Sequence, residues 1–248
     1  MDMNRPMQNI SETERDNQQI RGYSRWSLGS SGPRLLLALV VPFILAAGCA
    51  TSNTPPPENV ENICSIFQEK EGWYQHALDS EEKWGAPPHV LMAIVRHESR
   101  FVDNARPPRK TFLGVIPLGR PTTAYGYCQA VNGTWENYLE DTGNQSAERV
   151  NFRDAIDFVG WYTNVSFEKL GISKVDGYNQ YLAYHEGHVG YSQRSYKKKA
   201  WLMRVAKRVQ STADVYAAQL EGCREQLEVQ QQEQGKTTAG ILGQLLGS

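Results

Sequence analysis

The sequence predicts a mainly α-helical domain, and three observations support this fold class. Between residues 59 and 223, apolar residues recur at helical spacing, and Gly, Pro, Asn and Asp stand where such helices would begin or end. Alternation with a period of two, which marks half-buried strands, is almost absent. Hydrophobic residues make up 40% of the chain, and 12 Tyr and 6 Trp exceed what a disordered chain carries. The chain can therefore form a packed helical core.

Helix start and stop signals divide this region into six expected helices. Gly72 separates the first two, and the segment from Gly85 to Pro88 ends the second and begins the third. Asn151 and Asp176 are expected to cap later helices, and Gly171 to end one of them. The expected ranges are 59–70, 73–84, from Pro88 through Glu98, 152–170, 177 to about 185, and 201–220.

Composition and charge exclude several classes of protein. A formal net charge of −1 argues against a nucleic-acid binder that relies on a strongly basic face. Four Cys are too few for a small disulfide-rich scaffold, and collagen, coiled-coil and multi-span membrane proteins have different compositions. The 248 residues allow one large domain or two small ones, and the helical pattern favours one, over 59–223. Within it, residues 106–123 are expected to form a long loop rich in Pro, Gly and Arg.

Residues 1–48 have the order of a secretory signal. After Asp16 only basic charges remain before Leu35–Ala47, an apolar run of 13 residues. As a helix this run would span about 20 Å, short of the roughly 30 Å of a membrane core. Small residues then precede Cys49, and the order resembles the lipobox of bacterial lipoproteins. The alternative is an ordinary buried helix with a chance cysteine.

The resemblance implies a membrane anchor at Cys49, which would be lipidated and become the mature N-terminus. Residues 49–58 are then a Pro-rich tether between the membrane and the domain. Ala50 after the lipidated Cys resembles lipoproteins sent to the outer membrane, so we expect a periplasmic protein on its inner leaflet. Residues 224–248, rich in Gln and then in Gly and Leu, are expected to be a flexible tail.

Cys64 and Cys223 stand near the two ends of the expected domain. In an oxidising compartment we expect them to pair, which closes a loop of about 160 residues and stabilises the fold by ~4–5 kcal/mol. The alternative is that both are buried thiols. Cys128 is expected to be a small core residue.

Glu98 is the strongest candidate for a catalytic residue. It follows Leu91, Ile94 and Val95 on one helix face, so its carboxyl group should be poorly solvated. Poor solvation raises the pKa of a carboxylic acid and makes it a candidate general acid near neutral pH. A surface ion pair with a neighbouring arginine, Arg96 or Arg100, is the alternative.

Three short motifs follow one another along the chain. They are Glu98-Ser99-Arg100-Phe101, then Gly126-Tyr127-Cys128-Gln129, then Ala183-Tyr184-His185-Glu186-Gly187. This ordered set resembles the soluble lytic transglycosylase (SLT) domain of goose-type lysozyme-like enzymes, over roughly Glu61 to Leu220. The Tyr-His-Glu-Gly-His sequence of the third motif, residues 184–188, resembles a lipoprotein subgroup of this family. The resemblance implies a lysozyme-like helical fold with a substrate groove.

The resemblance also implies residue roles and a reaction. Glu98 matches the single catalytic acid/base, Ser99 a supporting neighbour, Gln129 a groove residue that binds substrate, and Tyr184 a tyrosine near the carboxylate. The family cleaves the β-1,4 bond between N-acetylmuramic acid and N-acetylglucosamine in peptidoglycan without water, leaving 1,6-anhydromuramyl ends and using no cofactor. Tyr125 precedes the second motif and Tyr127 lies within it, and both are candidates for the groove wall. Core packing explains either of them equally well.

Departures from the family pattern leave two rivals open. His185 and Glu186 replace the usual Asn-Ala, and a second carboxylate at Glu186 would allow a muramidase-type hydrolase. A non-catalytic peptidoglycan-binding lipoprotein with the same fold is the other rival. His185 and His188 are three residues apart rather than the four of a zincin helix, so no metal is expected. The expected partners are glycan strands and a membrane, not nucleic acid.

Overall fold

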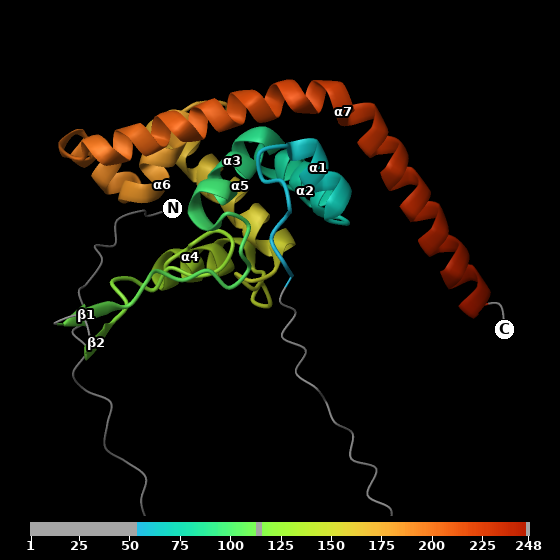
Figure 1. Cartoon of the computed structure of the whole chain (residues 1–248), viewed down its shortest axis with the longest axis horizontal. Helices are drawn as coiled ribbons and strands as arrows, with labels where there is room; N and C mark the ends of the chain where they lie inside the picture. The colour runs from blue at the N-terminus through green and yellow to red at the C-terminus, as the bar shows by residue number, and fades with distance from the viewer. Residues whose placement is uncertain (1–53, 113–115, 247–248) are drawn as a thin grey trace, which may run out of the picture. The chain divides into compact units, whose positions relative to one another are not determined.

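The computed structural model describes residues 54–112 and 116–246 (Figure 1). The expected signal segment and Cys49 lie outside the described residues. The helices are α1 (Ile63–Glu69), α2 (Trp73–Trp84), α3 (Pro88–Ser99), α4 (Asn132–Thr142), α5 (Phe152–Leu170), α6 (Gly177–Ser192) and α7 (Ala200–Leu246), with a short 3-10 helix, η1 (Ser195–Lys198). Strands β1 (Lys110–Phe112) and β2 (Ile116–Gly119) form one small antiparallel sheet. The fold is mainly helical, as the sequence predicts.

Helix α3 is the centre of the domain. Every side chain from Val90 to Val95 is fully buried, because α2, α5, α6 and α7 all contact this helix. Pro88 occupies the first turn, where its missing N–H leaves no hydrogen bond unmade. The helix ends at Arg100, which adopts the left-handed conformation. Glu98 therefore stands in the last turn of the most buried helix.

Helices with clear caps agree with the sequence analysis. Helices α2 and α5 have the expected bounds, and the Asn151 side chain accepts from the Arg153 backbone N–H. Gly171 ends α5 in a left-handed conformation. Helix α6 continues past the expected end to Ser192, with a break in helical geometry at Gly187 (φ 72°, ψ 159°).

Helix α4 was not expected from the sequence. Only Trp135 and Tyr138 of its residues are buried, and its first residue is preceded by Val131, which provides no side-chain cap. A helix that buries two side chains leaves little periodic signal. Its place is set by contact between these aromatic rings and Phe158 of α5, at centroid distances of 5.3 and 5.4 Å.

Part of the expected loop at 106–123 is a hairpin. Lys110 pairs with Gly119 and Phe112 with Ile116 across β1 and β2. Strands of three and four residues are too short to show a period-two pattern, so the sequence analysis classed the whole segment as loop. The segment projects from the helices as a hairpin, in place of the expected loop (Figure 1).

Both ends of the expected domain are held against its helices. Residues 54–58, assigned to the tether, contact the domain: the Lys70 amine donates to the Pro55 carbonyl at 2.7 Å, and Pro57 is buried. The segment from 224, expected as a flexible tail, continues α7 as helix to Leu246. No helix in the described ranges has the length and apolar character needed to cross a membrane.

A disulfide between Cys64 and Cys223 joins α1 to α7, with the two Cα atoms 6.1 Å apart. Hydrogen bonds around it strengthen the same junction. The Gln219 side chain accepts from the Ile63 N–H at 2.9 Å, and the Tyr216 hydroxyl donates to the Val60 carbonyl. Helix α1 is therefore fixed to the long helix by covalent and polar contacts together.

Removing this disulfide should destabilise the domain strongly. Replacing Cys64 and Cys223 together by Ser should lower the free energy of unfolding by about 4–5 kcal/mol, because the bridge closes a loop with a sequence separation of 159 residues. Urea denaturation measures the loss. A thiol count on denatured, non-reduced protein should label Cys128 but neither of the other two. Labelling of Cys64 or Cys223 would contradict the pairing.

Candidate active site

The three sequence motifs meet around Glu98. The charge of Glu98 acts on the Cys128 thiol of the second motif and on the Tyr184 hydroxyl of the third. The Tyr184 hydroxyl also donates to the Cys128 carbonyl at 2.5 Å. Motifs whose first residues are 28 and 57 positions apart along the chain thus form one cluster at the end of α3.

Glu98 is held in a partly enclosed position. The side chain keeps some contact with solvent, yet burial raises its pKa to about 7. A hydrogen bond from Tyr181 acts in the opposite direction and lowers the pKa, because it favours the carboxylate. The neighbouring His97 is uncharged at neutral pH, since burial and the charges of Arg96 and Arg208 lower its pKa to about 4. Glu98 is thus the titrating acid here.

A tight turn follows Glu98. Arg100 and Phe101 both have positive φ angles, 54° and 63°, which are costly for residues other than glycine. The buried Ser99 hydroxyl accepts from the Phe101 N–H at 3.1 Å, and the Phe101 ring is fully buried. Ser99 therefore holds the turn at the end of α3.

The second motif is a turn that only glycine can begin. A Cβ atom on Gly126 would lie 2.1 Å from the Arg149 carbonyl oxygen, and the residue has φ 78°. The Gln129 side-chain amide donates to the Ala105 and Gly126 carbonyls at 2.9 and 2.8 Å. The amide nitrogen of Gln129 is therefore used inside the protein, and its position beside Cys128 is fixed.

Of the two candidate groove tyrosines, Tyr127 is a core residue. It is 2% exposed, and its ring lies edge-on to Trp73 and Phe152, which stack on each other at 3.6 Å. Tyr125 is half-buried instead, and the Arg106 guanidinium lies 3.8 Å above its ring. The burial of Tyr127 supports core packing, the second of the two explanations that the sequence left open.

Comparison with known families identifies the chain. A sequence model described as "Transglycosylase SLT domain" matches residues 37–223, three quarters of the chain. The chain belongs to this family. Among curated proteins, none matches it significantly. Family membership means, in general terms, a lytic transglycosylase that acts on peptidoglycan, and it agrees with the mainly helical, lysozyme-like fold.

A tyrosine outside the three motifs also lies beside Glu98. Tyr181 hydrogen-bonds Glu98, whereas Tyr184, the tyrosine of the motif, bonds the Cys128 carbonyl. Tyr181 precedes Tyr184 by three residues, so both point from one face of α6. The three-residue spacing is the sequence signal that could have placed Tyr181 beside Glu98. Tyr181 lies outside the third motif, so the motif by itself does not indicate it.

Glu186, the possible second carboxylate, forms hydrogen bonds and an ion pair with residues other than Glu98. It is 3% exposed and accepts from Lys199 at 2.7 Å, from Ser195, and from His185 at 3.1 Å. Burial alone would raise its pKa, but these hydrogen bonds and the Lys199 charge lower it to about 2. Burial and the Tyr181 hydrogen bond, rather than Glu186, are what shift the pKa of Glu98.

The two histidines beside Glu186 face different neighbours. His188 stacks on the Tyr162 ring at 4.5 Å and lies 3.0 Å from the Ser166 hydroxyl, while His185 contacts Trp201. The break at Gly187 separates them. Within 54–112 and 116–246, no three His, Cys, Asp or Glu side chains converge as metal ligands.

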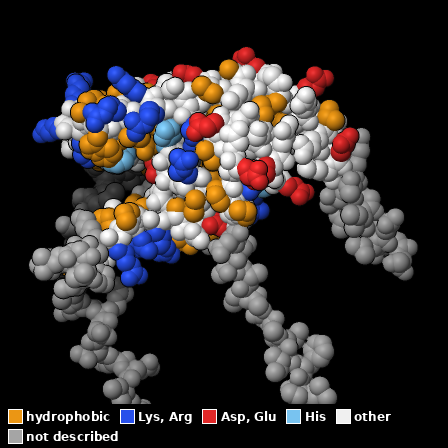
Figure 2. Space-filling view, in the orientation of Figure 1, with side chains coloured by type: hydrophobic (Ala, Val, Ile, Leu, Met, Phe, Trp, Pro, Cys, Tyr) orange, Lys and Arg blue, Asp and Glu red, His pale blue; other side chains and the backbone are white. Residues whose placement is uncertain are grey.

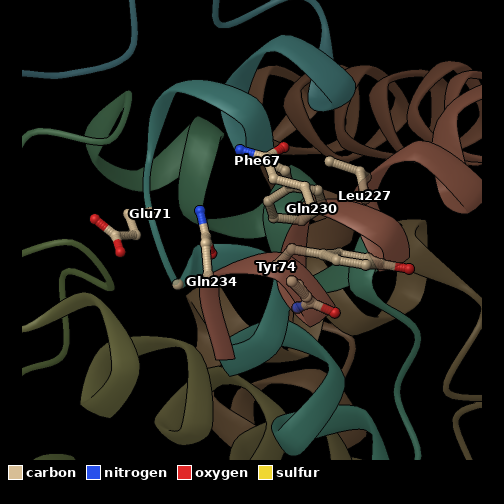
Figure 3. Close-up of a pocket in the computed structure, with 8 residues that line it drawn as sticks. Phe67, Glu71, Tyr74, Leu227, Gln230 and Gln234 are labelled. Carbon is tan, nitrogen blue, oxygen red and sulfur yellow. The ribbon is translucent and has the colours of Figure 1, made fainter. Parts of the chain in front are cut away.

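A small cavity between α1, α2 and α7 is distinct from this site (Figure 3). Phe67, Tyr74 and Leu227 provide its apolar lining, and Gln230 and Gln234 its polar lining. Its volume is about 10 Å³, which is close to the space that one water molecule needs. It is too small for a sugar.

Replacing Glu98 should change stability in a pH-dependent way. The pKa of Glu98 rises from 4.5 to about 7 on folding, so the folded state binds the proton more tightly and loses stability as pH rises through this range. Glu98→Gln removes that loss. Its gain over the wild type should grow from near zero at pH 4.5 to about 3 kcal/mol at pH 8. Urea denaturation at both pH values tests this.

The matched control is Glu225→Gln, at an exposed position on α7. It should leave the difference between the two pH values as in the wild type. A gain for Glu98→Gln that is equal at pH 4.5 and pH 8 would show that the carboxyl group does not carry a raised pKa.

Proposed function

We propose that the protein cleaves the bond between N-acetylmuramic acid and N-acetylglucosamine without water, with Glu98 as its single acid and base. One observation carries the proposal. Glu98 has a pKa raised to about 7 by burial, keeps contact with solvent, and lies where the three family motifs meet. At neutral pH about half of such groups are protonated, which suits a residue that must both give and accept a proton.

The reaction needs two proton transfers at one carboxyl group. Protonated Glu98 donates to the glycosidic oxygen as the bond from that oxygen to C1 of the muramyl sugar breaks. The resulting carboxylate then accepts the proton of the muramyl 6-hydroxyl as its oxygen attacks C1. A 1,6-anhydro ring forms, the proton returns to Glu98, and no water enters. The hydrogen bond from Tyr181 stabilises the carboxylate between the two transfers.

The surroundings of Glu186 support a lyase over a muramidase-type hydrolase. A hydrolase needs a second carboxylate as nucleophile or base beside the scissile bond. Three hydrogen-bond donors already engage Glu186, and its pKa of about 2 makes it a weak base. An internal nucleophile on the substrate removes the need for such a group.

In this proposal the remaining motif residues shape the site rather than react. Tyr184 fixes the second motif against α6 through the Cys128 carbonyl. Gln129 carries a side-chain oxygen that can accept from sugar hydroxyls, and Tyr125 offers a partly exposed ring. Both are proposed substrate contacts, supported by their places in the second motif.

We also propose that the chain is a periplasmic lipoprotein of the outer membrane. The support is the sequence order alone: an apolar run of 13 residues, small residues, Cys49 and then Ala50. A lipid at Cys49 would hold the domain beside the peptidoglycan layer. Mass spectrometry of the protein extracted from membranes tests this through the added acyl mass on the N-terminal peptide.

Purified sacculi test the proposed reaction. Glu98→Gln should lower the release of soluble muropeptides by roughly 10²- to 10⁴-fold, because the amide can neither donate nor accept the required proton. Glu225→Gln, which makes the same change at an exposed position of α7, should release them at the wild-type rate. Far-UV circular dichroism establishes that both variants are folded.

The mass of the product separates the rivals. Anhydro products are lighter than hydrolysis products by one water molecule, so the wild type should yield the lighter set. The heavier set would indicate a muramidase-type hydrolase. Binding to sacculi with no soluble product at high protein load would indicate a non-catalytic binding protein. Unchanged release by Glu98→Gln would remove Glu98 from the mechanism.

A further inference from the structure

One face of α7 leads away from the neighbourhood of Glu98. Thr212, Arg208 and Trp201 are spaced by four and seven residues, so they share this face. At its inner end the Thr212 hydroxyl lies 3.0 Å from the ring of His97, which precedes Glu98. Thr212 is buried, so the exposed part of this face runs from Arg208 to Trp201, which are seven residues or about 10 Å of helix apart. This part is long enough to contact linked sugars.

Its middle carries an exposed positive charge next to the candidate site. Arg208 is exposed, and its charge acts on both Tyr181 and His97. Tyr181 is the residue that hydrogen-bonds Glu98. The positive charge of Arg208 therefore reaches two residues that lie beside Glu98, the candidate catalytic acid.

The outer end carries an exposed aromatic ring held in place by a histidine. Trp201 is 49% exposed, and the His185 ring meets it nearly at a right angle with centroids 5.2 Å apart. His185 is in turn hydrogen-bonded to Glu186, which Lys199 also binds. A tryptophan whose orientation is fixed while its surface stays open is a suitable platform for a sugar ring.

The surrounding surface is strongly basic in a chain of net charge −1. Residues 189–213 contain no Asp or Glu and seven cations: Arg194, Lys197, Lys198, Lys199, Arg204, Lys207 and Arg208. Figure 2 shows Lys and Arg side chains gathered around hydrophobic ones at the end of the molecule formed by α6, η1 and the beginning of α7. Such a surface attracts a polyanion.

We propose that one surface binds the peptidoglycan strand beyond the bond that is cleaved. This surface, here called the α7 strip, consists of Trp201, Arg204 and Arg208 of α7 and the adjoining His185 of α6. Trp201 stacks on an N-acetyl sugar ring, and the two arginines pair with carboxylates of the stem peptides. The inference rests on the proposed function, because it gives the α7 strip the same substrate as Glu98. The contact between Thr212 on the same helix face and His97, which precedes Glu98, favours the strand. An anionic membrane would use the charges without needing a place beside the candidate site.

Binding to sacculi tests the α7 strip apart from catalysis. In protein that carries Glu98→Gln, adding Trp201→Ala should weaken co-sedimentation with sacculi about tenfold, the loss typical of an aromatic anchor. Adding Arg204→Ala and Arg208→Ala together should weaken it similarly at low salt. The arginine effect should disappear on sacculi whose stem peptides an amidase has removed, while the Trp201 effect should remain.

Two control variants change similar groups elsewhere. Val229→Ala removes an apolar side chain that is 51% exposed on α7, and Arg153→Ala removes an exposed cation at the start of α5. Both should bind sacculi like the parent. Trp201→Phe keeps an aromatic ring and should recover most of the binding, which separates loss of stacking from misfolding.

Unchanged binding of sacculi by the Trp201→Ala variant would overturn the proposal. So would a loss of binding to phosphatidylglycerol vesicles without any loss on sacculi, since that result assigns the surface to a membrane. Because the Glu98→Gln background performs no proposed chemistry, these results stand on their own. An inactive wild type would contradict the proposed function and leave the binding result unaffected.

Discussion

The burial of α3 is the constraint on which the rest of the site depends. Contact with four other helices encloses it from Val90 to Val95, and Glu98 follows one turn later at the margin of that core. Incomplete solvation there raises the pKa of Glu98 to about 7. The same carboxyl group on an exposed helix end would be fully ionised at neutral pH. The proposed acid is thus a consequence of where the central helix ends.

The turns around Glu98 convert this burial into a defined geometry. Ser99 supports two left-handed residues after the helix, and Gly126 allows the second motif to approach the Arg149 carbonyl closely. Tyr184 then joins the second motif to α6, which also brings Tyr181 to Glu98. The strained backbone at Arg100 and Phe101 is stable because the buried Ser99 and Phe101 side chains fix it. The residues of each motif therefore fix the backbone around Glu98, which explains why these residue types are present.

Sequence reasoning predicted the parts of the fold that local signals specify. Helices α2 and α5 follow from their glycine stops and the Asn151 cap. The sequence did not predict α4, because a helix that buries only two rings shows almost no periodicity. It did not predict the hairpin either, because strands of three and four residues are too short to show one. At the site, the rise in the Glu98 pKa followed from its apolar stripe. The burial of Tyr127, the role of Tyr181 and the ion cluster at Glu186 depend on tertiary neighbours, which spacing along one chain does not reveal.

A direct titration of Glu98 tests the central claim most simply. Protein labelled with ¹³C at the glutamate carboxyl carbon, compared with the Glu98→Gln variant to assign the signal, reports this one pKa by NMR. The account predicts a value near 7, set by burial and moderated by Tyr181. A value near the ordinary 4.5 of a solvated glutamate would contradict it, because Glu98 would then hold no proton to donate at neutral pH.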